Sequence, residues 1–399
     1  MSVSTRPISR THADQLGALA AAAPRATSLG LYIHVPFCLK RCYYCSFNTA
    51  PFRDDAKDRY VRALGREIDL VAGAGWAAGI SVETIFFGGG TPSLLEPGEL
   101  TDILERVRGR FTVRDDAEVT VECNPESVSR AKLGAYRATG VTRVSLGVQS
   151  LEDAILPHLG RLHAASGARA AFGAARAAGV PQVSVDLMYG LPALDADGWQ
   201  RTVSAVLDWR PDHLSAYGLT LDNGSLWGSA GVSGIPPEDT VIAQYWALAR
   251  SAAAAGYEHY EISNYALPGC RSRHNQIYWQ RREYLGLGPG ACGFLGRMRY
   301  SNARSTDRYC DLLERGLLPV AGHEVLSDRE ESGERLILGL RTLDGVPTQW
   351  LTARAALDRS LTARLDAWQE AGLLSIAHGR ARLTERGFLL SDALFVELL

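Results

Sequence analysis

The stretch SLGLYIHVPFCLKRCYYC, residues 28–45, joins an apolar run to three closely spaced cysteines. Its first part is rich in β-branched, aromatic and leucine side chains, a composition typical of a buried β-strand. Its second part is a polar loop with the spacing Cys-x₃-Cys-x₂-Cys, at Cys38, Cys42 and Cys45. The sequence therefore predicts a strand whose carboxyl end runs directly into a cluster of thiols.

Similar apolar runs follow at regular intervals. They are ETIFFGG (83–89), AEVTVEC (117–123), TRVSLGV (142–148), PQVSVDLM (181–188) and DHLSAYGL (212–219). The segments between them have helical spacing; in residues 54–71, for example, Leu64, Ile68 and Val71 fall on one face. Repeated alternation of strand and helix indicates parallel strands with right-handed crossovers, either in an open doubly wound sheet or in a full or partial barrel.

Unusual residues stand at the carboxyl ends of these runs and help to choose between the two folds. They are Gly88, Gly89, Gly90, Thr91, Glu122, Gln149, Ser150 and Asp186. Barrel active sites draw on the carboxyl ends of many strands, whereas an open sheet concentrates its site around one switch point. We therefore predict an α/β fold built on a partial (β/α)6 TIM-like barrel.

The pattern changes after about residue 235. From about residue 325 it becomes mainly helical, and near the end a helix, two short strands around a polar turn and a further helix predict a winged-helix-like module. We expect an N-terminal extension over 1–27, the barrel over 28–260, a connector over 261–320 and the C-terminal module over 321–399. The Ala-rich segment 16–26 resembles a short signal sequence, but its flank is polar and contains Asp14, so we predict a helical or disordered extension.

Composition limits the possible functions. The chain of 399 residues has a net charge of −2, which gives no electrostatic basis for binding nucleic acid or an anionic membrane. We find no apolar run long enough to span a bilayer, so an integral membrane protein is not expected. Of the seven cysteines, three are clustered and four are scattered, which favours a metal site in a reducing compartment, and we expect the cytoplasm.

The cluster has three interpretations. With His34 it could form a Cys₃His zinc site, and the thiols could also be unrelated. In the third, three thiolates hold three irons of a [4Fe–4S] cluster and leave the fourth iron open to a ligand. An open coordination position is the mark of a catalytic metal rather than a structural one.

The motif CLKRCYYC resembles the CxxxCxxC signature of the radical S-adenosylmethionine (SAM) superfamily. The resemblance implies that SAM chelates the open iron and that electron transfer from the cluster cleaves its sulfonium to give a 5′-deoxyadenosyl radical. By position, eight residues match the SAM contacts of that family: Tyr32, Gly89, Gly90, Thr91, Glu122, Gln149, Arg161 and Asp186.

The similarity extends in order over about residues 28–395 to the oxygen-independent coproporphyrinogen dehydrogenase group, which includes heme chaperone relatives called HemW. The dehydrogenases carry a further cysteine where this chain has Phe47, and they have a longer segment before the first cysteine than the fewer than forty residues found here. The chaperones carry the motif HNxxYW, matched here at residues 274–279. This match implies that His274 ligates heme with Asn275, Tyr278 and Trp279 around it. Many relatives have His where Cys292 stands.

Two classes of function remain. The first is a heme chaperone that holds a [4Fe–4S] cluster, SAM and heme, receives electrons from a donor and passes heme to an acceptor protein. The second is a radical enzyme, resembling either coproporphyrinogen III dehydrogenase or the class C radical methyltransferases. The intact HNxxYW motif and the C-terminal module favour the chaperone.

Overall fold

The computed structural model describes residues 6–7, 24, 26–356, 358 and 360–398. The apolar segment predicted as a helical or disordered extension lies mostly outside these residues. Within the described residues no helix is both long and apolar enough to cross a membrane.

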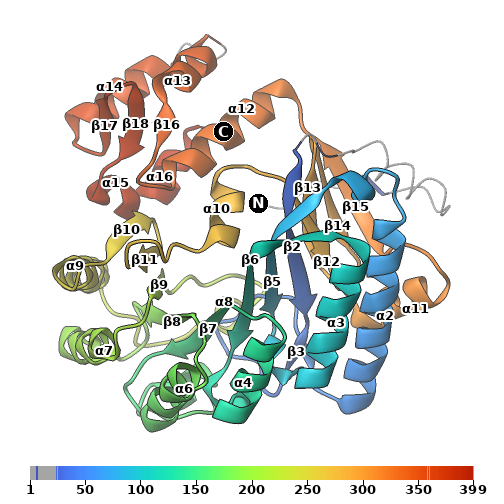
Figure 1. Ribbon diagram of the computed structural model, residues 1–399. Coiled ribbons are helices and arrows are strands. Elements are labelled where there is room, and N and C mark those ends of the chain that lie inside the picture. Colours follow the sequence, from blue (N-terminus) through green and yellow to red (C-terminus); the bar gives the residue numbers. More distant parts are fainter. Residues whose placement is uncertain (1–5, 8–23, 25, 357, 359, 399) are drawn as a thin grey trace.

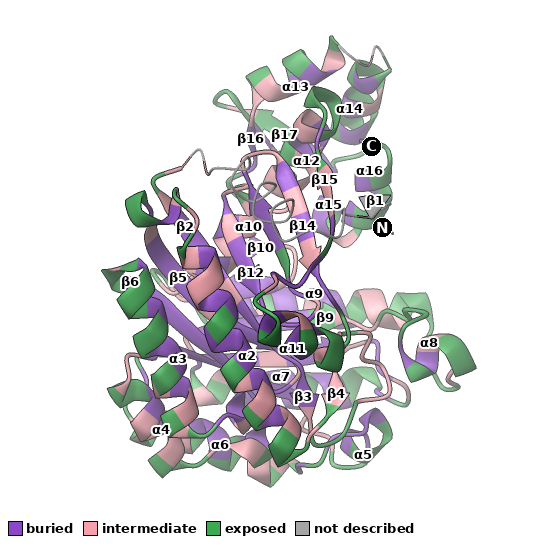
Figure 2. Ribbon diagram, turned by 90° about the vertical axis from the view of Figure 1, so that its right-hand side faces the viewer, coloured by how far each residue is buried: buried purple, intermediate pink, exposed green. Residues whose placement is uncertain are grey.

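The centre of the fold is a run of parallel strands that pair in the order of the sequence. They are β2 (Ser28–Val35), β5 (Ser81–Gly89), β6 (Thr112–Cys123), β7 (Arg143–Gln149), β8 (Gln182–Tyr189) and β9 (His213–Gly218). Every strand predicted from the apolar runs is confirmed. Their residues are mostly buried (Figure 2), which explains why the runs are nearly continuous in hydrophobicity.

Helices surround this sheet on its outer side (Figure 1). They are α2 (Asp54–Ala72), α3 (Pro97–Arg110), α4 (Arg130–Ala138), α6 (Ala165–Ala177), α7 (Ala196–Trp209) and α9 (Glu238–Ala254). Each follows a strand, and the apolar face predicted for α2 is confirmed, since Leu64, Ile68 and Val71 are buried in the main core. The arrangement is the predicted TIM-like partial barrel.

The sheet continues beyond the six predicted strands at both edges. Next to β2 lies the parallel strand β12 (Tyr284–Leu287), followed by the antiparallel strands β13 (Cys292–Leu295), β14 (Met298–Asn302), β15 (Val320–Val325) and β1 (Arg6–Pro7). Beyond β9 lie β11 (Asn264–Ala266) and β10 (Glu258–Glu261). Residues 261–320, expected to be a connector, therefore supply much of the sheet.

The C-terminal residues form a smaller unit with its own apolar core. Its elements are α12 (Asp328–Leu340), β16 (Val346–Pro347), α13 (Thr348–Ala355), α14 (Leu361–Glu370), β17 (Leu374–Ala377), β18 (Arg380–Leu383), α15 (Glu385–Leu389) and α16 (Ser391–Val396). The hairpin β17–β18 turns at His378 and Gly379, which both have positive φ. The predicted order of helix, strand, turn, strand and helix is confirmed. Figure 1 shows this C-terminal module beside β10 and the short helix α10 (Arg273–Trp279).

The buried carboxyl group of Glu67 connects helix α2 to the part of the sheet beyond β2. Glu67 of α2 accepts hydrogen bonds from the Tyr309 hydroxyl (2.6 Å), the Gly288 amide (2.8 Å) and the Asn302 amide group (2.6 Å). Burial raises the pKa of Glu67 to about 7, although the three donors oppose the shift. Tyr309 belongs to α11 (Thr306–Glu314), so one side chain connects α2, β14 and α11.

Candidate functional site

A cavity of about 370 Å³ lies at the carboxyl ends of the parallel strands, where barrel sites are built. The structure brings most of the predicted site residues together here. Those that line the cavity are Cys38, Cys42, Cys45, Gly89, Gly90, Thr91, Glu122, Gln149, Arg161 and Asp186. The predicted contact Tyr32 is not among the described residues that line it.

Cys38 ends the short strand β3 (Phe37–Cys38), and Cys42 and Cys45 lie in the loop between it and the short strand β4 (Ala50–Pro51). Backbone hydrogen bonds fix this loop, among them Cys45 N to Cys42 O (3.2 Å) and Tyr43 N to Leu159 O (3.1 Å). All three are partly exposed free thiols. In the part of the chain that the structure describes, no three Cys, His, Asp or Glu side chains converge on a single-ion site. Thiolates that each bind a different iron of a cluster do not need to converge in this way.

His34, the fourth ligand of the zinc interpretation, is engaged elsewhere. Its Nδ1 atom lies 3.0 Å from the Tyr32 hydroxyl, and its Nε2 atom lies 2.7 Å from the carbonyl oxygen of Asn48. The imidazole is buried, and burial lowers its pKa. With both ring nitrogens in hydrogen bonds, His34 offers no ligand atom to a metal, and the Cys₃His interpretation loses its fourth ligand.

Burial disfavours the thiolate forms of Cys38 and Cys45. Burial raises the pKa of Cys38 to about 11 and also raises the pKa of Cys45. The Thr91 hydroxyl, 3.5 Å from the Cys38 sulfur, partly opposes this shift. Iron binding must therefore displace protons from these groups.

Gly89 and Gly90, at the end of β5, line the cavity and also lie very close to the segment that carries the cysteines. Gly89 has φ +111°, and a Cβ atom there would lie 2.5 Å from the His34 ring. A Cβ atom at Gly90 would lie 2.7 Å from the backbone of Pro36. The close approach that needs glycine is thus between the end of β5 and the loop that carries the cysteines. The two glycines therefore allow the loop that carries the cysteines to pack closely against the end of β5.

Two half-buried carboxyl groups face the cavity. Glu122 accepts a hydrogen bond from the Gly89 amide (3.1 Å), and Asp186 accepts one from the Ser145 hydroxyl (2.9 Å). Burial, followed by the charge of Asp186, raises the pKa of Glu122 to about 7, and burial raises the pKa of Asp186. Neither group makes an ion pair with a described residue. A cationic ligand in the cavity would stabilise both as carboxylates.

Arg161 joins the thiol loop to the strand ends. Its guanidinium donates to Gly147 O (2.5 Å) and to Asn124 Oδ1 (2.8 Å), and Nη1 lies 3.6 Å from Cys42 Sγ. The buried Nε atom has no hydrogen-bond partner among the described residues. An anionic group of a ligand could accept from it. The position of Arg161 follows from Gly160, whose positive φ (+83°) turns the chain at the end of α5 (Leu156–Leu159) beside Cys42.

Asn124, Ser145 and Gly147 are among the lining residues that the sequence analysis did not identify. Asn124 also donates to the Thr91 hydroxyl (3.2 Å), so it connects two predicted residues. Ser145, Gly147 and Gln149 alternate along β7, and period-two spacing towards Gln149 is the signal that points to the first two. Gln149 has φ +67°, at a bulge between β7 and β8. Left-handed geometry is uncommon for glutamine, which fits a position held by the site.

The HNxxYW motif lies in α10, and none of its residues is among the described residues that line the cavity beside the cysteines, which we call the thiol cavity. The imidazole of His274 is fully buried, with Nδ1 2.7 Å from the Thr84 hydroxyl and Nε2 2.8 Å from the Tyr278 hydroxyl. It stacks on Phe86 with ring centroids 5.0 Å apart. Burial lowers its pKa to about 3, so the ring is neutral. Heme ligation by His274 stays a prediction, and in this conformation the ring would first have to leave Thr84 or Tyr278.

Cys292 begins β13 and is not among the described residues that line the thiol cavity. Its thiol is free and exposed.

The comparisons with known proteins agree with this geometry. The radical SAM superfamily model matches residues 32–206, and the HemN C-terminal domain model matches residues 326–390. The heme chaperone HemW of Mycobacterium tuberculosis (strain H37Rv) is 39% identical, over 93% of this chain and 94% of its own length. HemW of Bacillus subtilis is 33% identical, over 91% of this chain and 97% of its own length.

The solved structure of Escherichia coli coproporphyrinogen III oxidase (HemN), a radical SAM enzyme, aligns with a TM-score of 0.86. The alignment covers all of this chain and 95% of that one at 22% identity, so it concerns the fold.

The fold, the loop that carries the cysteines and the polar residues at the carboxyl ends of the strands together define a radical SAM protein. The chain belongs to the HemN-like group of this superfamily, in the HemW branch. Membership implies a [4Fe–4S] cluster and SAM as cofactors. The residues fit both, since three free thiols, two unpaired carboxyl groups and the Arg161 Nε atom line one cavity.

Proposed function

We propose that this protein is a radical SAM-type heme chaperone, which binds heme and transfers it to an acceptor protein. The observation that carries the proposal is the 39% identity to a heme chaperone over 93% of the chain. Phe47, where coproporphyrinogen dehydrogenases carry a further cysteine, supports the chaperone over that enzyme. Phe47 lines the thiol cavity.

In this proposal Cys38, Cys42 and Cys45 hold the cluster, and the remaining iron is open to SAM. When bound, the cluster supplies electrons to the sulfonium of SAM. The chain itself orients the ligand: Arg161 donates to its carboxylate, and Glu122 and Asp186 offset its positive charge. Gly89, Gly90, Thr91 and Gln149 form the surrounding wall. Tyr32 acts indirectly, by holding His34 beneath Gly89.

Heme is the proposed cargo, and α10 the proposed element that contacts it. An electron donor and a heme acceptor complete the expected set of partners. The neutral state of His274 is compatible with a ligand role, but both its nitrogens are occupied within the protein. We therefore propose α10 as a whole, rather than this imidazole, as the part of the chain that contacts heme.

The experiment is an anaerobic reconstitution of the cluster followed by titration with hemin, with and without SAM, recorded at the Soret band. We expect saturation at about one heme per chain and no turnover of coproporphyrinogen III. The absence of a saturable band would contradict the chaperone. Release of 5′-deoxyadenosine or S-adenosylhomocysteine without heme binding would instead identify a radical enzyme.

A further inference from the structure

A second cavity, of about 330 Å³, lies between α10 and the C-terminal module and shares no lining residue with the thiol cavity. Figure 1 shows the two elements side by side. Its walls include two tryptophans and several charged residues: Trp279, Trp350, Arg271, Arg335, Arg380 and Asp344. We refer to it as the module cleft.

The HNxxYW helix divides its residues between the barrel core and the module cleft. His274 and Ile277 are buried towards the barrel. Gln276, Trp279 and Gln280 line the cleft, at the spacing of one helix face. The motif thus presents a surface to this cavity that does not include its histidine.

Two indole rings stand in the cleft walls, each with a guanidinium over its face. The Arg341 guanidinium lies 4.4 Å from the centroid of the Trp279 ring, and that of Arg335 lies 5.2 Å from the centroid of Trp350. The buried Nε1 atom of Trp279 has no hydrogen-bond partner in the described part of the chain. Such walls suit a flat, apolar ligand with polar edges.

The lining carries more positive than negative charge, with three arginines against Asp344. Arg380 is held by the carbonyl oxygens of Asp344 (2.6 Å) and Gly345 (2.9 Å), and Arg271 pairs with Glu258 (3.1 Å) and Asp344 (3.3 Å).

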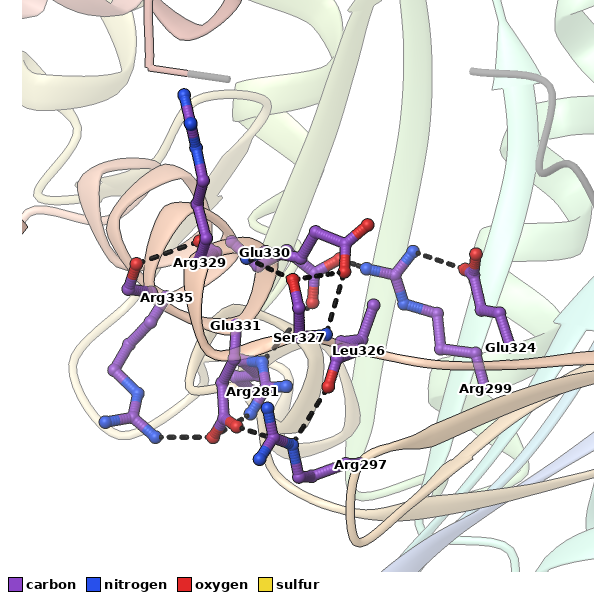
Figure 3. Close-up of polar contacts among 12 residues, drawn as sticks. Arg281, Arg297, Arg299, Glu324, Leu326, Ser327, Arg329, Glu330, Glu331 and Arg335 are labelled. Atoms are coloured by element: carbon purple, nitrogen blue, oxygen red, sulfur yellow. Dashed lines mark hydrogen bonds and ion pairs between the residues drawn. The ribbon is translucent and has the colours of Figure 1, made fainter. Parts of the chain in front are cut away.

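Arg335 pairs with Glu331 (3.1 Å), but Glu331 also pairs with Arg281 and Arg297, as Figure 3 shows. Arg281 and Arg297 have further carboxylate partners, in Glu334 (3.3 Å) and Asp328 (2.6 Å) respectively. The Arg335 side chain is 44% exposed and has N–H donors beyond its one contact with Glu331, so it can bind a further anion. The same network fixes α12, and with it one wall of the cleft, against the loop after α10.

We propose that the module cleft binds the carboxylate-bearing edge of heme, a planar apolar macrocycle with two carboxylates. The macrocycle packs against Trp279 and Trp350, and its carboxylates pair with Arg335 and Arg380. The proposal rests on the proposed chaperone function and names the site of its cargo. Ligand cavities span roughly 300–1,000 Å³, so a cleft at the low end of this range encloses one edge and leaves the rest of the ring outside.

The test is a hemin titration of the full chain with its cluster reconstituted, comparing the wild type with Arg335→Gln and Trp350→Ala. The matched control is Arg386→Gln, which removes an exposed arginine of the same module outside the cleft. We expect the Kd for hemin to rise by about tenfold or more in both cleft variants and to stay unchanged in the control. Hemin dimethyl ester, in which the carboxylates are blocked, should bind the wild type as weakly as hemin binds Arg335→Gln.

The outcomes distinguish a wrong heme site from a wrong function. If the wild type binds hemin, and both cleft variants and the ester bind equally well, the cleft is not the heme site while the chaperone function stands. If the wild type itself does not bind hemin, the proposed function fails and the cleft assignment fails with it. Circular dichroism of each variant establishes that weaker binding does not come from unfolding. Arg335→Gln is the variant least expected to disturb the fold, because the Arg335 side chain is exposed to solvent.

Discussion

The guanidinium of Arg161 contacts the thiol of Cys42, with Nη1 3.6 Å from Sγ. The two residues are 119 positions apart in the sequence, and the barrel brings the segment after β7 against the loop after β2. The contact fixes the guanidinium beside the loop that carries the cysteines. The same side chain keeps its Nε atom without a described partner, so it can serve the cluster and a ligand together.

Arg161→Gln is therefore expected to weaken SAM binding by about tenfold or more, because a charge-assisted hydrogen bond to the ligand carboxylate is lost. Equilibrium dialysis of reconstituted protein against SAM measures the change. Arg161→Lys should recover only part of the affinity, since lysine keeps the charge but not the planar donor geometry. Arg169→Gln, on the exposed side of α6, is the control. An unchanged Kd in Arg161→Gln would remove this residue from the site.

Each of the single variants Cys38→Ala, Cys42→Ala and Cys45→Ala is expected to lower the iron bound after reconstitution, because each removes one thiolate ligand of the cluster. Iron content and the visible absorption of the cluster measure this loss. Cys270→Ala provides the matched control, as Cys270 is a partly exposed free thiol that does not line the cavity. A variant of the first three that keeps full iron content would show that its cysteine is not a ligand.

The barrel core could be predicted from the sequence because its strands are long enough to give a recognisable apolar pattern. β5 and β6 have 9 and 12 residues and are almost continuously apolar where they are buried. β10 to β14 have only 3 to 5 residues each and include glycines such as Gly286 and Gly293, so no periodicity could reveal them. Their partners in the sheet are fixed by tertiary packing, which overrides local preference.

The sequence predicts which residues form the site, but it does not predict the contacts between them. Cysteine spacing and polar strand ends locate the cavity, because parallel strands place their carboxyl ends together. The neighbours of a side chain cannot be read from spacing. Thr84, which occupies one nitrogen of His274, lies 190 residues away in the sequence, and His34 is committed to Asn48 and Tyr32 by the path of the loop.

The pKa of Glu67 predicts a pH dependence of stability. Its folded-state pKa, about 7, is above its ordinary value of 4.5, so the folded protein binds more protons than the unfolded chain between these values. The contribution is fully present below pH 4.5 and is lost as the pH rises through about 7. The free energy of unfolding should therefore fall by up to about 3 kcal/mol over this range from this group alone.

Glu67→Gln isolates that contribution, because glutamine keeps the size of the side chain and does not titrate. Urea unfolding at several pH values between 5 and 8 should give a smaller decrease of stability with pH for the variant than for the wild type. Glu314→Gln, at an exposed carboxylate of α11, serves as the control because the hydrogen bond from Arg59 lowers the pKa of that group, so it does not titrate between pH 5 and 8. Equal slopes for the wild type and Glu67→Gln would mean that the buried carboxyl group does not titrate in this range.

A variant of His274 distinguishes a structural role of this residue from a role as heme ligand. In the structure its imidazole fills a buried site and occupies the Thr84 and Tyr278 hydroxyls, so His274→Ala should lower the free energy of unfolding by about 2–4 kcal/mol through the cavity and the unpaired hydroxyls. If heme binds in the module cleft, the Kd for hemin in the folded variant should change by less than about threefold. Urea unfolding and Soret titration of the same preparation measure both quantities. Loss of the Soret band with unchanged stability would instead make His274 the axial ligand, and α10 would then have to turn its inner face to the heme.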